Sequence, residues 1–133
     1  MTPVASDLDD VLAAARRRLD RVGPEEAATL VAAGALLVDT RSVEQRRRDG
    51  EVPGAVVIDR NVLEWRLAPT SDHRMPGAGD PDRIVIVMCD VGYSSSLAAA
   101  TLQDVGLPRA TDLDGGFRAW AAAGLPVRPL LPE

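Results

Sequence analysis

The residue best suited to do chemistry in this chain is its single cysteine, Cys89. Five apolar residues, 84–88, precede it, and the loop 89–96 then combines it with a glycine and three serines before an alanine-rich segment begins at Leu97. This pattern predicts a buried strand, a short loop headed by the cysteine, and a helix. Because loop N–H groups and the start of a helix both favour negative charge, the arrangement is typical of a reactive thiolate.

The rest of this loop holds the candidate substrate-binding residues. If the loop's amides curl around the sulfur, they form a ring of donors similar to an oxyanion hole. Gly92 permits such a curl because glycine tolerates a positive φ. The serine hydroxyls either add donors or cap the helix. The candidates are Asp90, Val91, Gly92, Tyr93, Ser94 and Ser95.

Charged side chains near the loop could change the pKa of the thiol or bind a substrate anion. A carboxylate beside a thiol raises the pKa of the thiol if it points inward, so we expect Asp90 to point to solvent. Arg60 follows a predicted strand and is a candidate cationic partner for a substrate anion; the alternative is a structural ion pair with Glu64, four residues on. Arg66 is a weaker candidate, for which we favour a surface role.

Composition limits the class of protein. The 133 residues fit a single domain, and the hydrophobic share of 46% is enough for a real core. The net charge of −5 argues against a general nucleic-acid or anionic-membrane binder. No apolar stretch is long enough to span a membrane, and the first ten residues lack an apolar signal core, so we expect a cytoplasmic protein. A reducing compartment would keep the lone cysteine free.

Predicted helices and strands alternate along the chain. The expected helices span residues 8–19, 24–33, 43–48, 62–67, 97–105 and 117–123. The expected strands span residues 21–22, 35–38, 55–58, 84–88 and 110–113. Continuous apolar strands that alternate with helices indicate a parallel sheet covered on both faces. The long segment 68–82, which contains three prolines, is expected to be a functional or mobile loop.

The polar segments that follow the predicted strands point to one site. Ligands of such sheets bind outside the carboxyl ends of the strands. Residues 39–41, 59–61 and 89–94 each follow a predicted strand. We therefore expect these three segments to meet at one edge of the sheet.

Four motifs, in this order, resemble the rhodanese-like single-domain sulfurtransferase family across residues 21–126. They are Asp39-x-Arg41, Val52-Pro53-Gly54-Ala55, Cys89-x-x-Gly92-x-Ser94-Ser95 and Asp114-Gly115-Gly116-Phe117-x-x-Trp120. The resemblance implies an α/β fold with a five-stranded, mostly parallel sheet flanked by helices on both faces. It also implies that the cysteine carries sulfane sulfur as a persulfide, with no metal or organic cofactor needed. The expected division is a helical extension (1–20), the rhodanese-like domain (21–127) and a tail (128–133).

Two positions differ from the usual pattern of this family. Ser94 stands where many members have an arginine that helps to hold the anionic donor. Glu51 stands where a histidine usually precedes the Pro-Gly turn. Both differences bear on which donor is used rather than on the chemistry of the cysteine.

Several other residues could have either a structural or a functional role. We favour a buried hydrogen-bonded pair of Asp39 and Arg41 that braces the loops, over direct catalysis. Gly115 and Gly116 predict a close approach of backbone to the cysteine loop, with ligand contact as the alternative. Phe117 and Trp120 are expected in the core, and Trp65 either there or in a pocket wall. His73, the only histidine, is not expected to act as a base.

The expected activity is transfer of sulfane sulfur from thiosulfate or a persulfide donor to cyanide or a thiol, through Cys89. One alternative is a non-catalytic sulfur carrier or redox sensor that acts with a protein partner. A phosphatase or arsenate reductase is less favoured, because their cysteine loops are usually a residue longer and end in an arginine that clamps the oxyanion. The expected partners are small-molecule donors and thiols, with a protein persulfide as a further candidate, and neither nucleic acid nor membrane. The oligomeric state stays open.

Overall fold

Parallel strands form the central sheet of the computed structural model, which describes residues 7–130. Within this range the strands are β1 (Leu36–Asp39), β2 (Val56–Val57), β3 (Val85–Met88) and β4 (Ala110–Asp112). Their spatial order is β2-β1-β3-β4, and every pair is parallel. All residues of β1 and β3 are buried, as is typical of central strands covered on both faces. The predicted α/β class is confirmed.

The sheet has four strands among the described residues, rather than the expected five. The segment expected as the first strand contributes only an isolated parallel bridge between Val22 and Leu113. Its backbone hydrogen bonds link Val22 to Asp112 and to Asp114, at 3.2 and 2.8 Å. A longer strand is prevented because helix α2 (Pro24–Ala32) starts two residues later, and proline has no N–H for a ladder.

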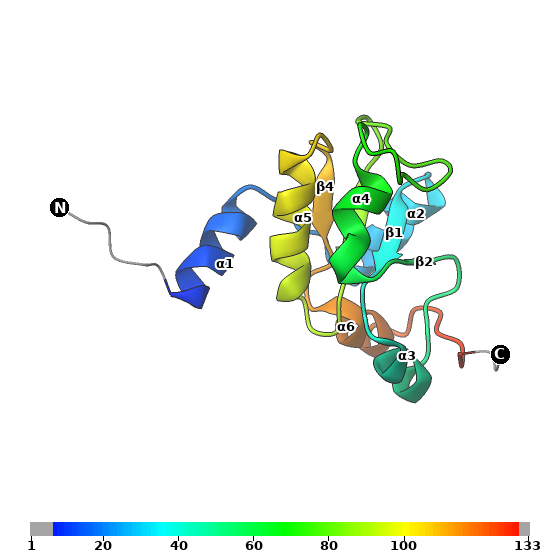
Figure 1. Ribbon diagram of the computed structural model, residues 1–133. Coiled ribbons are helices and arrows are strands. Elements are labelled where there is room, and N and C mark those ends of the chain that lie inside the picture. Colours follow the sequence, from blue (N-terminus) through cyan, green and yellow to red (C-terminus); the bar gives the residue numbers. More distant parts are fainter. Residues whose placement is uncertain (1–6, 131–133) are drawn as a thin grey trace.

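Helices cover the sheet, and their starts follow signals in the sequence (Figure 1). Asp7 caps α1 by accepting from the Asp10 N–H at 2.9 Å, and Ser42 forms a capping box with Gln45. The remaining elements, besides α2, are α1 (Leu8–Arg17), α3 (Val43–Asp49), the 3-10 turn η1 (Arg60–Val62), α4 (Leu63–Leu67), α5 (Ser94–Asp104) and α6 (Gly116–Ala122).

Two hydrophobic clusters lie on opposite faces of the sheet. Alternate residues of β3 divide between them, as the two-residue period of a strand requires. Val85 and Val87 belong to the cluster that includes residues of α4 and α5. Ile86 and Met88 belong to the cluster with residues of α2 and α6, which includes Phe117 and Trp120. The prediction that these two aromatic residues are core residues is confirmed.

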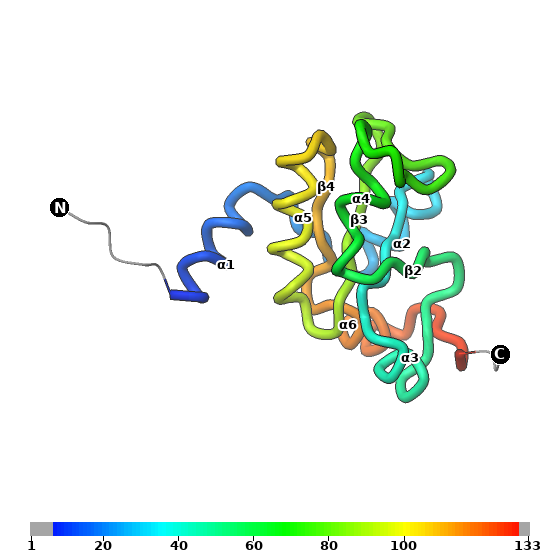
Figure 2. Tube along the Cα trace, viewed as in Figure 1, coloured from blue at the N-terminus to red at the C-terminus, as the bar shows by residue number. Residues whose placement is uncertain are grey.

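Helix α1 lies outside the sheet and packs beside α5 (Figure 2). Leu19, just after the helix, is buried in the cluster below α5, and Arg18 forms an ion pair with Asp104 at the end of α5. No helix in the described part of the chain has the length and apolar character to cross a membrane. The cytoplasmic location and the division at residues 20 and 127 stay predictions.

Candidate active site

Cys89 follows β3 directly, at the carboxyl edge of the sheet. Its side chain is buried, with 6% of the residue exposed. The backbone N–H of Gly92 donates a hydrogen bond to Cys89 Sγ at 3.2 Å. Gly92 has a φ of +88°, which curls the loop so that this amide faces back toward the sulfur. The cysteine is therefore covered by protein, and a loop amide is directed at it.

Helix α5 begins earlier than expected, at Ser94 rather than Leu97. Ser94, Ser95 and Ser96 form its first turn; the Ser96 N–H donates to the Tyr93 carbonyl at 3.1 Å, and the N–H groups of Ser94 and Ser95 precede the first helical hydrogen bond. The positive end of the helix therefore lies directly beside the cysteine loop, where it favours a thiolate. The sequence concealed this start because serine is a moderate helix former that also favours caps and turns.

The pKa of the Cys89 thiol lies below its ordinary value. Burial by itself raises that pKa, but hydrogen bonds that favour the thiolate outweigh burial. The groups that lower it are the hydroxyls of Ser95 and Ser94 and the N–H groups of Ser95 and Gly92, of which the Gly92 N–H lies within hydrogen-bond distance of Sγ. Asp112 competes for the single hydroxyl proton of Ser95, since its carboxylate lies 2.8 Å away. The amides and Ser94 are thus the donors least committed elsewhere.

A buried carboxylate, Asp112, supports the start of α5 from the neighbouring strand. Its Oδ2 accepts hydrogen bonds from the hydroxyls of Ser95 and Ser96, at 2.8 and 2.7 Å. Arg21 neutralises it, with Nε 2.8 Å from Oδ1 and Nη2 3.2 Å from Oδ2. Because Asp112 is fully buried, these four bonds compensate for its lost hydration.

Two arginines reach the cysteine loop from its outer side. Arg16 Nη2 donates to the Gly92 carbonyl oxygen at 2.8 Å, and Arg21 Nη2 donates to the same oxygen at 3.0 Å. Arg16 also donates from Nε to Ser96 Oγ at 3.1 Å and lies over the ring of Tyr93, 5.4 Å from its centroid. The N-terminal helix is thereby connected to the loop that carries the cysteine.

The Gly115–Gly116 pair packs its backbone against the cysteine loop. A Cβ on Gly116 would lie 2.6 Å from the Cys89 carbonyl oxygen, and a Cβ on Gly92 would lie 2.7 Å from Gly115 N. The Phe117 N–H donates to the Cys89 carbonyl at 2.8 Å. The absence of side chains at these glycines is what allows the two segments to approach this closely.

The structure corrects the expectation that Asp90 points to solvent. Its side chain is 19% exposed, and Oδ2 accepts from Arg118 Nε at 3.0 Å. The reason is the docking of α6: the Arg118 N–H donates to the Asp90 carbonyl at 3.1 Å, which brings the arginine side chain beside the carboxylate. Arg118 offsets the negative charge that Asp90 places near the thiolate.

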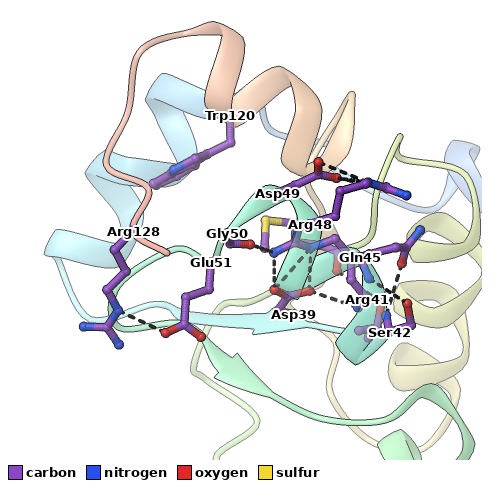
Figure 3. Close-up of polar contacts among 12 residues, drawn as sticks. Asp39, Arg41, Ser42, Gln45, Arg48, Asp49, Gly50, Glu51, Trp120 and Arg128 are labelled. Carbon is purple, nitrogen blue, oxygen red and sulfur yellow. Dashed lines mark hydrogen bonds and ion pairs between the residues drawn. The ribbon is translucent and has the colours of Figure 1, made fainter. Parts of the chain in front are cut away.

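Asp39 and Arg41 form a buried pair (Figure 3). Arg41 Nη2 lies 2.9 Å from Asp39 Oδ2 and donates to the Gly50 carbonyl at 2.9 Å. The guanidinium also lies over the ring of Phe117, 3.7 Å from its centroid. Both charged side chains have no exposed surface. They link β1, the end of α3 and α6.

Arg60 forms an ion pair with a neighbouring carboxylate. Its Nη1 lies 2.8 Å from Glu64 Oε1, one turn along the chain, so the structure shows the ion-pair alternative. Trp65, expected in the core or a pocket wall, is 57% exposed and lines a shallow groove with His73. The Arg66 guanidinium donates to the His73 carbonyl at 2.9 Å.

The residues that support the loop from outside were not predicted from the sequence: Arg16, Arg21, Ser96, Asp112 and Arg118. One signal was available, because an acidic residue near the end of a buried strand needs a partner. Its partners come from distant segments of the chain, Arg21 lying 91 residues before Asp112. Spacing alone gives no indication of such pairs.

The chain is thus an α/β domain whose parallel sheet presents, at its carboxyl edge, a cysteine with a loop amide directed at its sulfur. Residues 23–123 match the Rhodanese-like domain, and the chain belongs to this family. It is 35% identical over 100 residues to Thiosulfate sulfurtransferase GlpE of Stutzerimonas stutzeri (strain A1501), across 75% of this chain and 83% of the relative. It is 30% identical over 102 residues to a sulfurtransferase of Allochromatium vinosum, across 68% and 92% of the two chains. The predicted family is confirmed.

Solved structures share the fold. A protein of unknown function from Rhodopseudomonas palustris CGA009, described as a possible tyrosine phosphatase, superposes with a TM-score of 0.83 at 30% identity, over 96% of this chain and 98% of that one. Thiosulfate sulfurtransferase from Pseudomonas aeruginosa superposes with a TM-score of 0.66 at 24% identity, over 83% of this chain and 19% of that one. The second likeness concerns the fold alone.

Proposed function

We propose that this chain is a thiosulfate sulfurtransferase that carries sulfane sulfur on Cys89 as a persulfide. The observation that carries the proposal is the hydrogen bond from the Gly92 amide to Cys89 Sγ, 3.2 Å long, at the start of α5. It supports the proposal because an amide donor directed at the sulfur favours negative charge there. The names of the curated relatives support the reaction class.

The first half-reaction loads the cysteine. The Cys89 thiolate attacks the outer sulfur of thiosulfate, so that a new S–S bond forms while the S–S bond of thiosulfate breaks. Sulfite leaves with the electron pair of the broken bond. The product is a Cys89 persulfide, and no external oxidant or reductant is consumed.

The second half-reaction unloads it. A thiophilic acceptor, cyanide or a thiolate, attacks the outer sulfur of the persulfide. The bond between the two sulfurs breaks, and its electron pair returns to Cys89 as the thiolate. The outer sulfur lies about 2 Å beyond Sγ and carries the negative charge of the persulfide. Donors in the loop and in the first turn of α5 stabilise that charge.

The proposal is tested by thiocyanate production from thiosulfate and cyanide. We expect turnover in the wild type and none above background in Cys89→Ser, which keeps a similar shape but has no comparable nucleophile. The control is Ser71→Ala, which changes a hydroxyl in the 68–82 loop instead. Full activity in Cys89→Ser would contradict the proposal.

Two alternatives have distinct outcomes. Phosphatase activity is suggested by the description of the Rhodopseudomonas palustris protein. The cysteine loop here has Ser94 and Ser95 where such loops end in arginine, so we expect no Cys89-dependent hydrolysis of a phosphomonoester. A sulfur carrier would accept sulfur from a protein persulfide but not from thiosulfate. Loading by the protein donor alone would favour the carrier over the enzyme.

A further inference from the structure

The carbonyl of Gly92 is held by two guanidinium groups. Arg16 and Arg21 both donate to this one oxygen, at 2.8 and 3.0 Å. Charge-assisted hydrogen bonds of this kind are stronger than those between neutral groups. Two such hydrogen bonds to one loop carbonyl therefore fix the direction in which that carbonyl points.

That direction determines where the next amide points. The peptide between Gly92 and Tyr93 is trans, as are all the described peptide bonds, so its C=O and N–H point in opposite directions. With the carbonyl turned to the two arginines, the Tyr93 N–H points away from them. The Gly92 N–H, one peptide earlier, already donates to Cys89 Sγ.

We propose that Arg16 and Arg21 are positioning residues that clamp the Gly92 carbonyl from outside and thereby hold the amides of the loop toward the Cys89 sulfur. The role deepens the sulfur-transfer function proposed above and rests on it. This role connects helix α1 with the reaction, since Arg16 lies in the last turn of that helix. It also supplies positive charge from behind a loop that contains no basic residue between Cys89 and Ser96.

Both arginines are held in place by further contacts. Arg16 is fixed by Ser96 Oγ at 3.1 Å and by the ring of Tyr93. Arg21 is only 17% exposed and is fixed by Asp112 on β4 and by Asp114, whose Oδ1 lies 3.2 Å from Nη1. A clamp whose own position is fixed can orient a peptide, whereas a mobile surface arginine cannot.

The electrostatic effect of Arg21 on the cysteine supports this role. Burial alone would lower the pKa of Arg21, but Asp112 raises it, with smaller contributions from Asp114 and from the Cys89 thiolate. The attraction is mutual, so the cation favours the thiolate. The charged and titratable groups around the cysteine loop are Asp90 and Tyr93 of the loop, Arg16 of α1, Arg21, Asp112 of β4, Asp114, Arg118 of α6, and Arg41 and Asp49 beneath α6.

The test is the titration of Cys89 in Arg16→Gln. The ultraviolet absorbance of the thiolate is recorded against pH, with Cys89→Ser and Cys89→Ser/Arg16→Gln as the respective blanks. We expect the midpoint to rise by about 0.5 pH unit or more, because a cation near the loop and the fixed direction of its amides are both lost. The matched control is Arg17→Gln, which removes an exposed arginine from the same turn of α1 and should leave the midpoint unchanged.

Arg16→Lys provides a second variant that keeps the charge. A lysine is a point charge without the planar fork, so it cannot reproduce both hydrogen bonds in the same geometry. We expect a midpoint between those of the wild type and Arg16→Gln, and this variant alone carries the test if Arg16→Gln does not fold. At pH values below the wild-type midpoint, a rise of about 0.5 in the thiol pKa lowers the thiolate fraction about threefold, so the rate of sulfur transfer by Arg16→Gln should fall about threefold. Above the midpoint the loss should be smaller.

The outcomes separate this inference from the proposed function. The positioning role would be overturned if Arg16→Gln folds and keeps the wild-type midpoint. If Arg16→Gln does not fold, the same result in a folded Arg16→Lys would overturn it. Either result counts whether or not the wild type transfers sulfur. An equal shift in Arg17→Gln would also overturn it, because the effect would then be one of general charge. A wild type without sulfur transfer but with the shifted midpoint in Arg16→Gln would contradict the proposed function alone.

Discussion

The carbonyl oxygen of Cys89 occupies the space that a side chain on Gly116 would need. A Cβ at Gly116 would lie 2.6 Å from that oxygen and 2.7 Å from the carbonyl carbon of Asp90. The first residue of α6 is therefore part of the wall that shapes the cysteine loop. The relationship explains why a glycine stands at position 116.

Gly116→Ala should displace the cysteine loop and reduce sulfur transfer. The matched control is Gly124→Ala, because both glycines have positive φ, +62° and +75°, but a Cβ on Gly124 would meet nothing within 4 Å. Each substitution carries a backbone cost of about 1 kcal/mol or more, seen as a lower melting temperature. Only Gly116→Ala adds the collision, so only it should lose most activity. Equal activity in the two variants would contradict this role of Gly116.

The reactivity of Cys89 should depend on pH as expected for a lowered thiol pKa. Alkylation by iodoacetamide rises with the thiolate fraction, so its rate should level off at a lower pH than for an ordinary cysteine, whose pKa is about 8.5. The same lowering means that ionisation favours the folded state. Its contribution to stability is therefore present above the pKa of the unfolded thiol and is lost as the pH falls through the folded value.

The control is the same alkylation in urea. Unfolding removes the donors of the loop and of α5, so the midpoint should move up toward the ordinary value. A midpoint that is the same in the folded and the unfolded chain would show that the loop does not favour the thiolate.

Arg41→Ala should destabilise the fold strongly. It leaves the buried Asp39 carboxylate without its partner and removes the stacking on Phe117. Breaking one side of a buried ion pair costs about 3–5 kcal/mol in the free energy of unfolding. Urea denaturation of the variant measures the loss. A change below about 1 kcal/mol would show that the pair does not brace these loops.

Arg60→Gln should change little, in contrast. The Arg60 side chain is 40% exposed and its guanidinium is bound by both carboxylate oxygens of Glu64. A partly exposed pair of this kind, four residues apart along the chain, contributes less than about 1 kcal/mol. We expect the thiosulfate KM to stay at its wild-type value. A clear rise in KM, with the fold intact, would show that Arg60 binds the donor.

Much of the fold could be predicted because it depends on local patterns. The run before Cys89 reads as a buried strand, and Pro24 and Ser42 mark helix starts that the structure shows. The prediction of a fifth strand was wrong because the two-residue segment Arg21-Val22 does not reveal that it makes a single bridge. The start of α5 was misplaced because a run of serines is compatible with a loop as well as with a first helical turn.

The cysteine loop was predictable, but its surroundings were not. Cys89 and Gly92 are three residues apart, and their types suggest the contact that the structure contains. The bonds from Arg16 to Gly92 and from Arg21 to Asp112 join residues 76 and 91 positions apart. Such pairings arise from tertiary packing, and an arginine-rich helix looks like any solvated helix until that packing is known.

The most direct measurement is the intact mass of the protein after incubation with thiosulfate and removal of excess donor. A persulfide on Cys89 predicts the mass of one added sulfur atom, lost again after cyanide, and absent in Cys89→Ser. An unmodified wild-type mass under conditions of active turnover, or the same added sulfur in Cys89→Ser, would contradict a persulfide at this cysteine.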